Sequence, residues 1–178
     1  MKTVELTSAD WNDLSIVIDE IVKKYSNPED KSKLLDFKTI VSLQKVSTQI
    51  KADNKVYVDG LADIFKQRDE LIKAAQEKLV SMKEAMFKKA EKDGVVDEGE
   101  KKKVEDFMQM QLVQTNEEII KEIDPKLKEL NEKVGNEKLV LEIGDEKSKI
   151  LTESFEKHAQ EFYNSKGKMV EVYETLTK

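Results

Sequence analysis

The fold is decided between residues 30 and 92, which read DKSKLLDFKTIVSLQKVSTQIKADNKVYVDGLADIFKQRDELIKAAQEKLVSMKEAMFKKAEK. This stretch contains no proline and one glycine, Gly60, and it is rich in helix-forming residues. At about 1.5 Å of rise per residue, an unbroken helix of this length would extend roughly 90 Å. Few globular domains hold such a helix. The stretch therefore favours an elongated architecture that offers helical surface to other protein chains.

Apolar residues recur along this stretch in alternating steps of three and four, which is the spacing of a coiled-coil seam. Ser47, Asn54 and Arg68 interrupt the seam, which argues against a self-pairing zipper. After Ala75 the apolar face rotates, because the pattern gains one residue. The seam positions are Ile40, Leu43, Ser47, Ile50, Asn54, Tyr57, Leu61, Ile64, Arg68, Leu71 and Ala75, followed by Leu79, Met82 and Met86.

The pattern favours one continuous helix through this stretch. The alternative is two helices joined near residues 52–60, since Ala52-Asp53-Asn54 is the weakest helical segment and Gly60 permits a bend.

The chain is predicted to reverse at Lys92-Asp93-Gly94, and Asp97 with Glu100 has the spacing of a helix-capping box. A second long helix should then run antiparallel to the first, giving a hairpin over residues 31–134 with its tip near 93–99. The apolar face of that second helix comprises Val104, Phe107, Met108, Gln111, Leu112, Thr115, Ile119 and Ile123. Asp124-Pro125 predicts either a kink or a fresh helix start.

The two ends of the chain predict a compact base, formed by residues 1–30 and 135–178. Val4 and Leu6 share one face of a short strand, and Thr7 or Ser8 is a suitable N-cap for the helix that follows. That helix carries Trp11, Leu14, Ile18, Ile21 and Tyr25 on one face and ends at Ser26-Asn27-Pro28.

Residues 139–143 form the best second strand, because they are dense in aliphatic residues and are followed by Gly144-Asp145. A shorter helix should carry Ile150, Leu151, Phe155, His158 and Phe162, and the segment 169–174 is compatible with either strand or helix. We therefore expect a mainly α, single elongated domain over residues 1–178, with a small sheet of two or three strands near the termini.

The composition limits the classes of function. Apolar and charged residues each make up 38% of the chain, against roughly 45–50% and about 25% in average globular proteins. The net charge is −6, and the basic run Lys101-Lys102-Lys103 is followed at once by Glu105 and Asp106. A nucleic-acid-binding surface needs a concentrated basic face, so we expect no nucleic-acid partner.

No cysteine is present, which excludes disulfides and thiol chemistry. No apolar run reaches the length of a signal peptide core or a membrane helix, so we expect no membrane partner and no visible export signal. These observations favour a cytoplasmic protein.

Residues 89–100 resemble a degenerate EF-hand calcium loop between two predicted helices. Asp93, Asp97 and Glu100 fall on loop positions 5, 9 and 12, but Lys89 occupies position 1, where a carboxylate must bind the cation. A capped helix reversal explains the same residues, and the three acids are only weak candidates for metal ligands.

No catalytic signature is present. His158 is the only histidine, and its apolar neighbours on the predicted helix indicate a buried structural role. The sequence contains no nucleophile elbow and no glycine-rich phosphate loop. We therefore predict no enzymatic activity and no cofactor.

Four methionines lie around the predicted hairpin tip: Met82, Met86, Met108 and Met110. Adaptable packing explains them, but thioethers also suit irregular contacts with a partner. They are the candidate partner-binding residues.

Several segments resemble a group of small, largely uncharacterised helical proteins encoded by phages and prophages of Gram-positive bacteria. The resemblance is carried by Val4-Glu5-Leu6-Thr7, by Phe37 through Ile72 ending in Arg68-Asp69-Glu70-Leu71-Ile72-Lys73, by Glu91-Lys92-Asp93-Gly94 and by Leu139-Val140-Leu141-Glu142-Ile143. It implies a phage origin, a location in the host cytoplasm or in a virion, and a role in interaction or assembly, and it transfers no functional residues.

The leading hypothesis is a non-enzymatic protein that acts through protein–protein contact, as a phage structural or assembly component or a helical adaptor. Its partners would be other protein chains, in a multi-subunit assembly or a homo-oligomer. The alternative is a phage-encoded regulator that binds and inhibits a host protein through an acidic surface. Such a surface requires acids gathered on one face, whereas the sequence intersperses them with lysine.

Overall fold

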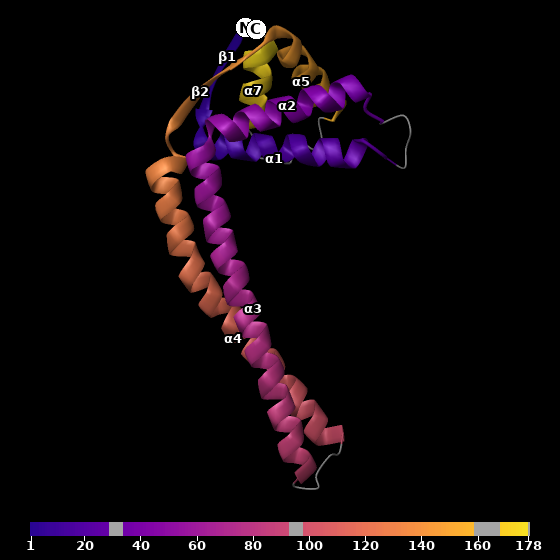
Figure 1. Cartoon of the computed structure of the whole chain (residues 1–178), viewed down its shortest axis with the longest axis vertical. Coiled ribbons are helices and arrows are strands. Elements are labelled where there is room, and N and C mark those ends of the chain that lie inside the picture. The colour runs from indigo at the N-terminus through magenta and orange to yellow at the C-terminus, as the bar shows by residue number, and fades with distance from the viewer. Residues whose placement is uncertain (29–33, 93–97, 159–167, 178) are drawn as a thin grey trace. The chain divides into compact units, whose positions relative to one another are not determined.

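The computed structural model describes residues 1–28, 34–92, 98–158 and 168–177. It is mainly α-helical, as predicted, with a small two-stranded sheet. Internal contacts divide the chain into two compact units. Unit 1 comprises Met1–Asp59 and Leu130–Lys178, and unit 2 comprises Gly60–Glu129. Each unit is described below by itself (Figure 1).

Unit 1 is built on two helices that pack against each other, α1 (Ser8–Tyr25) and α2 (Phe37–Asp53) (Figure 1). The predicted apolar face of α1 is confirmed, because all of its members are buried: Trp11, Leu14, Ile18, Ile21 and Tyr25. From α2, Leu43 and Ile50 complete this core. Burial of a side chain of this size stabilises the fold by about 1.5–3 kcal/mol.

The start of α1 is capped as the sequence indicates. Thr7 is the N-cap, and its hydroxyl oxygen accepts a hydrogen bond from the backbone N–H of Asp10 at 3.2 Å. The hydroxyl also donates to the Asp10 carboxylate. The first of these bonds satisfies one of the backbone donors that the first turn of a helix leaves open, and the second holds the two side chains together. The helix α1 ends at Tyr25, before the predicted turn.

The strands β1 (Lys2–Thr7) and β2 (Lys138–Ile143) form an antiparallel sheet in which Val4 lies opposite Leu141. Alternate residues of both strands are buried, which is the pattern of a sheet with one face on the core. The indole Nε1 of Trp11 donates to the carbonyl of Leu139 at 2.9 Å and thereby fixes α1 to β2.

The segment predicted as either a third strand or a helix is a helix, α7 (Lys168–Thr177). The third strand is therefore wrong. Val172 and Leu176 are both buried and lie one helical turn apart, whereas Glu174, which a strand would place on the same face, is exposed, so the burial has the period of a helix. The preceding helix α5 (Asp145–Lys157) contacts α7, and α7 also contacts β1.

Of the two alternatives for residues 30–92, the continuous helix is wrong and the pair of helices joined near residues 52–60 is confirmed. The helix is broken at Asn54, between α2 and α3 (Lys55–Lys92), while Gly60 lies within α3. Asn54 leaves helical geometry, with φ −101° and ψ 24°. Its side-chain amide is buried and donates to the carbonyl of Ser8 at 2.7 Å. This contact with the first turn of α1 holds Asn54 in place and separates the two helices.

The predicted hairpin of residues 31–134 also starts too early, because α2 packs on α1 inside unit 1. Ser47, which interrupts the apolar seam, is buried and donates to Asp19 Oδ1 at 2.7 Å. Lys51 binds the same carboxylate. The polar residue Ser47 therefore interrupts the apolar seam because it forms a hydrogen bond between α2 and α1.

Tyr57, in the first turn of α3, meets a short π-helical turn, η2 (Asn131–Gly135), that follows α4 (Glu98–Leu130). The Tyr57 hydroxyl donates to Asn131 Oδ1 at 2.6 Å. Burial, followed by the nearby carboxylates of Asp13 and Asp10, raises the pKa of Tyr57. Pro125 lies within α4, so the fresh helix start predicted there is wrong.

The N-cap of α2 predicts a pH-dependent contribution to stability. Asp36 Oδ1 accepts from the backbone N–H of Thr39 at 2.9 Å, and Oδ2 accepts from the Thr39 hydroxyl at 2.7 Å. These two hydrogen bonds, the hydroxyl's first, hold the pKa of Asp36 below its ordinary value of 3.8. The stabilisation is thus present above pH 3.8 and is lost as the pH falls through the lower folded value.

Asp36→Ala should therefore lower the free energy of unfolding by about 1 kcal/mol at neutral pH. Chemical denaturation across pH should show this difference narrowing below pH 3.8. Asp36→Asn, which keeps the acceptor oxygen, is the control and should retain most of the stability at neutral pH. A pH-independent loss in Asp36→Ala would show that the carboxylate charge does not contribute.

Candidate interaction surface

Unit 2 consists of the antiparallel helices α3, from Gly60 onward, and α4, up to Glu129, lying side by side (Figure 1). The predicted α3 seam is confirmed as the less exposed face, from Leu61 through Ile64 and Leu79 to Met86. Within the described part of unit 2, only Ile64, Val104 and Ile123 are buried apolar residues. The other seam residues are mostly half-buried, so this hairpin has a thin apolar seam and a large exposed surface.

Polar side chains within the seam are satisfied locally. The Arg68 guanidinium lies 5.0 Å from the centre of the Phe65 ring and binds Asp69 at 2.8 Å. From α4, Lys126 Nζ donates to Gln67 Oε1 at 2.8 Å and to Glu122 at 3.1 Å. The Lys126–Gln67 bond joins the two helices. Such exposed contacts contribute less than about 1 kcal/mol each, so they position the helices more than they stabilise them.

The four candidate methionines do not share one surface. Met82, Met86 and Met108 are half-buried along the seam, whereas Met110 is exposed. Residues 108 and 110 lie about 200° apart around a helix, which separates Met110 from the others. Met110 is the methionine with the exposure that a partner would need.

A second line of residues follows α4 on the side away from the seam, and we call it the outer stripe. Its spacing alternates strictly between three and four, which is the spacing that coiled coils use. All of its members are exposed: Lys103, Asp106, Met110, Val113, Glu117, Ile120 and Asp124. Met110, Val113 and Ile120 remain 50%, 49% and 54% exposed.

Sequence reasoning found Met110 but missed Val113 and Ile120. The stronger apolar pattern along this helix runs through Val104 and Ile123, and this pattern predicted the seam. The three-four spacing of the outer stripe was visible in the sequence. Because charged residues occupy the ends of the stripe, its apolar pattern was weaker than that of the seam.

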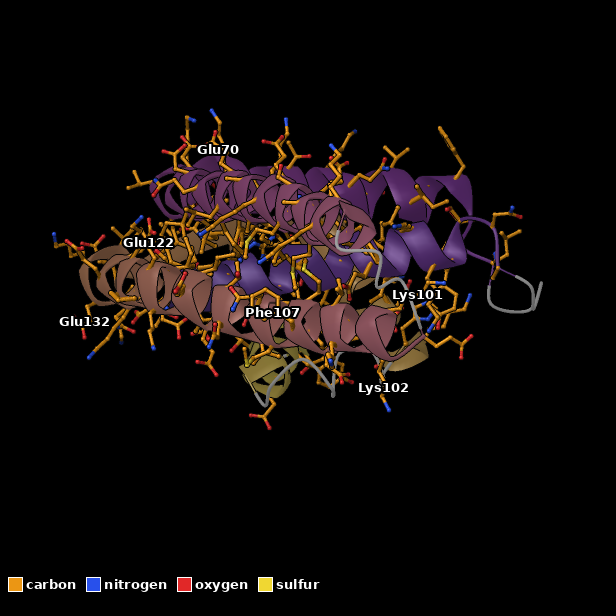
Figure 2. The ribbon with its side chains drawn as sticks, turned by 90° about the horizontal axis from the view of Figure 1, so that it is seen from below. Glu70, Lys101, Lys102, Phe107, Glu122 and Glu132 are labelled. Atoms are coloured by element: carbon orange, nitrogen blue, oxygen red, sulfur yellow. The ribbon has the colours of Figure 1, made fainter. Side chains whose placement is uncertain are left out.

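The charged side chains of unit 2 that Figure 2 labels point in different directions. Figure 2 shows Glu70 projecting from α3 on the side away from α4, and Lys101 and Lys102 diverging from the start of α4. The lysine run therefore spreads around the helix. These two side chains therefore do not form one concentrated basic face, and the absence of a nucleic-acid partner stays a prediction.

The three acids proposed as calcium ligands lie in a part of the chain that the structure does not describe. Asp93 and Asp97 fall outside the described residues, and so does the side chain of Glu100. Among the described residues, no group of three or more His, Asp or Glu side chains could hold a metal ion. Metal binding by the loop stays a weak prediction.

The described surface hollows are shallow and carry no evident chemistry. One, of 490 Å³, is lined by residues of α2 and β2, including Gln49, Asp53 and Val140. The carboxylates of Asp145 and Glu146 have lowered pKa values because each is hydrogen-bonded to an ammonium group, that of Met1 and that of Lys38 respectively. These are exposed structural ion pairs.

His158, the only histidine, is buried, as predicted. It follows α5, and its ring stacks on that of Tyr25 with centroids 4.1 Å apart. Phe155 of the same predicted face is also buried, while Phe162 lies outside the described residues. The histidine contributes to packing in unit 1.

No protein-family model, curated protein or solved structure matches this chain. The resemblance to phage-encoded helical proteins therefore stays a prediction. Within the ranges that the structure describes, no helix is long and apolar enough to cross a lipid bilayer. The geometry of the outer stripe is the best guide to function.

Proposed function

We propose that this protein works without catalysis, by binding other protein chains through the α3–α4 hairpin. The observation that carries the proposal is the outer stripe, where Met110, Val113 and Ile120 are exposed at coiled-coil spacing. Isolated exposed apolar residues are common on protein surfaces, but an aligned set along one helix matches the way grooves and helices recognise each other.

The thin seam supports the same proposal. A hairpin needs one buried stripe to hold its two helices together, and here the seam supplies it through Ile64, Val104 and Ile123. The outer stripe is not required for that purpose. Its apolar residues are therefore available for a partner.

Within this class, an assembly component or a helical adaptor is our leading proposal, and its phage origin rests on the sequence resemblance. The regulator alternative is less well supported, because it needs an acidic face. On the described hairpin, acids and bases are paired locally, as in Lys126–Glu122 and Arg68–Asp69.

The experiment is site-specific photo-crosslinking of the full-length chain in the cells that make it, with the crosslinking residue placed at Val113. Val80 of α3 is the matched control position, because it is also an exposed valine of unit 2 but lies off the outer stripe. We expect a reproducible protein adduct from Val113 and little or none from Val80.

The mass of the adduct identifies the class of partner. Copies of this chain or of one other structural protein indicate assembly, whereas a host enzyme would favour the regulator. Light scattering on the purified chain provides the complementary measurement. A monomer at all concentrations, together with no adduct from Val113, would contradict the proposed function.

A further inference from the structure

We propose that Asn54 is the hinge of a domain exchange, in which residues 37–92 form one straight helix and two copies of the chain trade residues 1–53. The proposal goes beyond the proposed function, since it does not involve the outer stripe. In such an exchange, residues 1–53 of each copy pack on the remainder of the other copy, through the contacts that already hold unit 1 together. The partner is therefore defined by the chain's own core, not by an exposed face.

The sequence across the break suits a continuous helix. The apolar seam keeps its three-four spacing from Ile50 through Asn54 to Tyr57, so the two helices would join in phase. Residues 51–56 contain no proline and no glycine, and asparagine itself is only a moderately poor helix former. The local sequence alone therefore does not end α2 at Asp53.

The backbone at Asn54 already makes helical hydrogen bonds. Its N–H donates to the carbonyl of Ile50 at 2.9 Å, and its carbonyl accepts from the N–H of Val58 at 3.1 Å, which is the i to i−4 pattern of an α-helix. Its φ of −101° and ψ of 24° would have to change to about −63° and −42° for α2 and α3 to join. A single residue thus separates the broken helix from the straight one.

The hydrogen bond from the buried Asn54 amide to the carbonyl of Ser8, 2.7 Å long, opposes this change. Ser8 belongs to the exchanged segment, and its own N–H donates to the carbonyl of Glu137 at 2.9 Å. Asn54 is therefore tied to the point where that segment meets β2. Rotation of Asn54 to helical φ and ψ turns its amide away from Ser8, so this bond is made in the monomer and lost in the exchanged dimer.

The described contacts between the exchanged segment and the rest of unit 1 are the same in both forms. They join β1 to β2 and α7, α2 to β2 and α5, and α1 to η2. After the exchange the same residues meet across the two copies, so their contribution cancels between monomer and dimer. What remains is the cost of association and the hinge, where the gain of helix opposes the loss of the Asn54–Ser8 bond. Asn54 therefore sets the balance, and in the native chain it favours the monomer.

The first test refolds the full-length chain from denaturant at high concentration and measures monomer and dimer by size-exclusion chromatography with light scattering. Asn54→Ala removes the amide and favours the helix at both hinges of the dimer, so it should tighten dimerisation by about a hundredfold. Asn54→Gly removes the same amide but disfavours a helix, so it should dimerise clearly less than Asn54→Ala.

Val56→Ala is the matched control for helix propensity. Val56 is an exposed residue of α3, two positions after the hinge, and alanine there strengthens a helix that is present in both forms. Dimerisation should therefore not change. Circular dichroism of each variant verifies that it folds.

The second test distinguishes the exchange from any other dimer, and the cysteine-free chain makes it clean. Thr3 of the exchanged segment lies opposite Glu142 in the sheet. In a chain carrying both Thr3→Cys and Glu142→Cys, oxidised after refolding, the monomer should form its disulfide within one chain. The exchanged dimer should instead link two chains, which run as a covalent dimer on a denaturing gel. Thr3→Cys alone is the control for random linkage.

Two results would overturn the exchange. One is an Asn54→Ala chain that stays monomeric at every concentration, and the other is an Asn54→Ala dimer whose disulfides all lie within single chains. If Asn54→Ala does not fold, the native hinge with the two cysteines decides. Linked chains that increase with the refolding concentration are then expected, and their absence overturns the proposal. The Val113 crosslink tests the proposed function separately, so the two can fail independently.

Discussion

Replacing Trp11 by alanine is expected to lower the free energy of unfolding by about 3–5 kcal/mol. The indole is fully buried in the core of unit 1, so its removal leaves a large cavity. It also removes the hydrogen bond from Nε1 to the carbonyl of Leu139, which joins α1 to β2. Because many domains are stable by only about 5–15 kcal/mol, this substitution should bring unit 1 close to unfolding.

Chemical denaturation followed by circular dichroism measures this effect. Trp11→Phe separates the two causes, because it keeps most of the ring volume but loses the Nε1 donor, and it should retain more stability than alanine. Ile16→Ala is the matched control, since Ile16 is an exposed residue of the same helix and should change stability by less than about 0.5 kcal/mol. A tolerated Trp11→Ala would contradict the core assignment.

Gly135→Ala is the second substitution with a large expected effect. In most helical sites a glycine-to-alanine change stabilises by about 0.5–1 kcal/mol. Here a Cβ atom would lie 2.7 Å from Asn131 Oδ1 and 3.0 Å from the Tyr57 ring, the two groups that form the hydrogen bond between η2 and α3. We expect a net destabilisation of about 1–3 kcal/mol, because the Asn131 side chain must move and this bond must break.

Gly144→Ala is the matched control, because nothing lies within 4 Å of its added Cβ, and it should be nearly neutral. A double-mutant cycle identifies the cause. In an Asn131→Ala background, Gly135→Ala should cost much less, since the atom nearest to the new methyl group has gone. An additive cycle would mean that the cost has another origin.

Local patterns along the chain are enough to predict the mainly α fold. The apolar face of α1, the Thr7 cap and the short strands β1 and β2 all follow from residues within a few positions of each other. The seam of unit 2 follows from the same kind of periodicity. These predictions succeeded because the signal and the structure lie in one segment.

The break at Asn54 could be located only as an alternative, because its cause is distant in sequence. The side-chain amide finds its acceptor on Ser8, at the start of another helix. Likewise, the segment of α7 fits a strand or a helix until Val172 and Leu176 are seen to be buried, near α5 and β1, while Glu174 between them is exposed. Contacts of this kind depend on tertiary structure, and periodicity alone does not contain them.

The outer stripe shows a different limit. Val113 and Ile120 have the spacing of an interface, but their exposure could be known only once the seam had been assigned to the opposite side of α4. The sequence of α4 contains two apolar patterns, the seam and the outer stripe, and either could pack on α3. The structure establishes which of them packs on α3.

The pairing of β1 with β2 sets an order on how this protein is made. Val4 is synthesised early, but its partner Leu141 follows more than 130 residues later. The ribosome therefore completes α1, α2 and the entire hairpin before the sheet can close, and long-range pairing of this kind is slow compared with helix formation. Until then, the apolar side chains of Val4 and Leu6 lack the strand that completes their sheet, and a nascent chain interrupted before residue 138 would present them to chaperones and proteases.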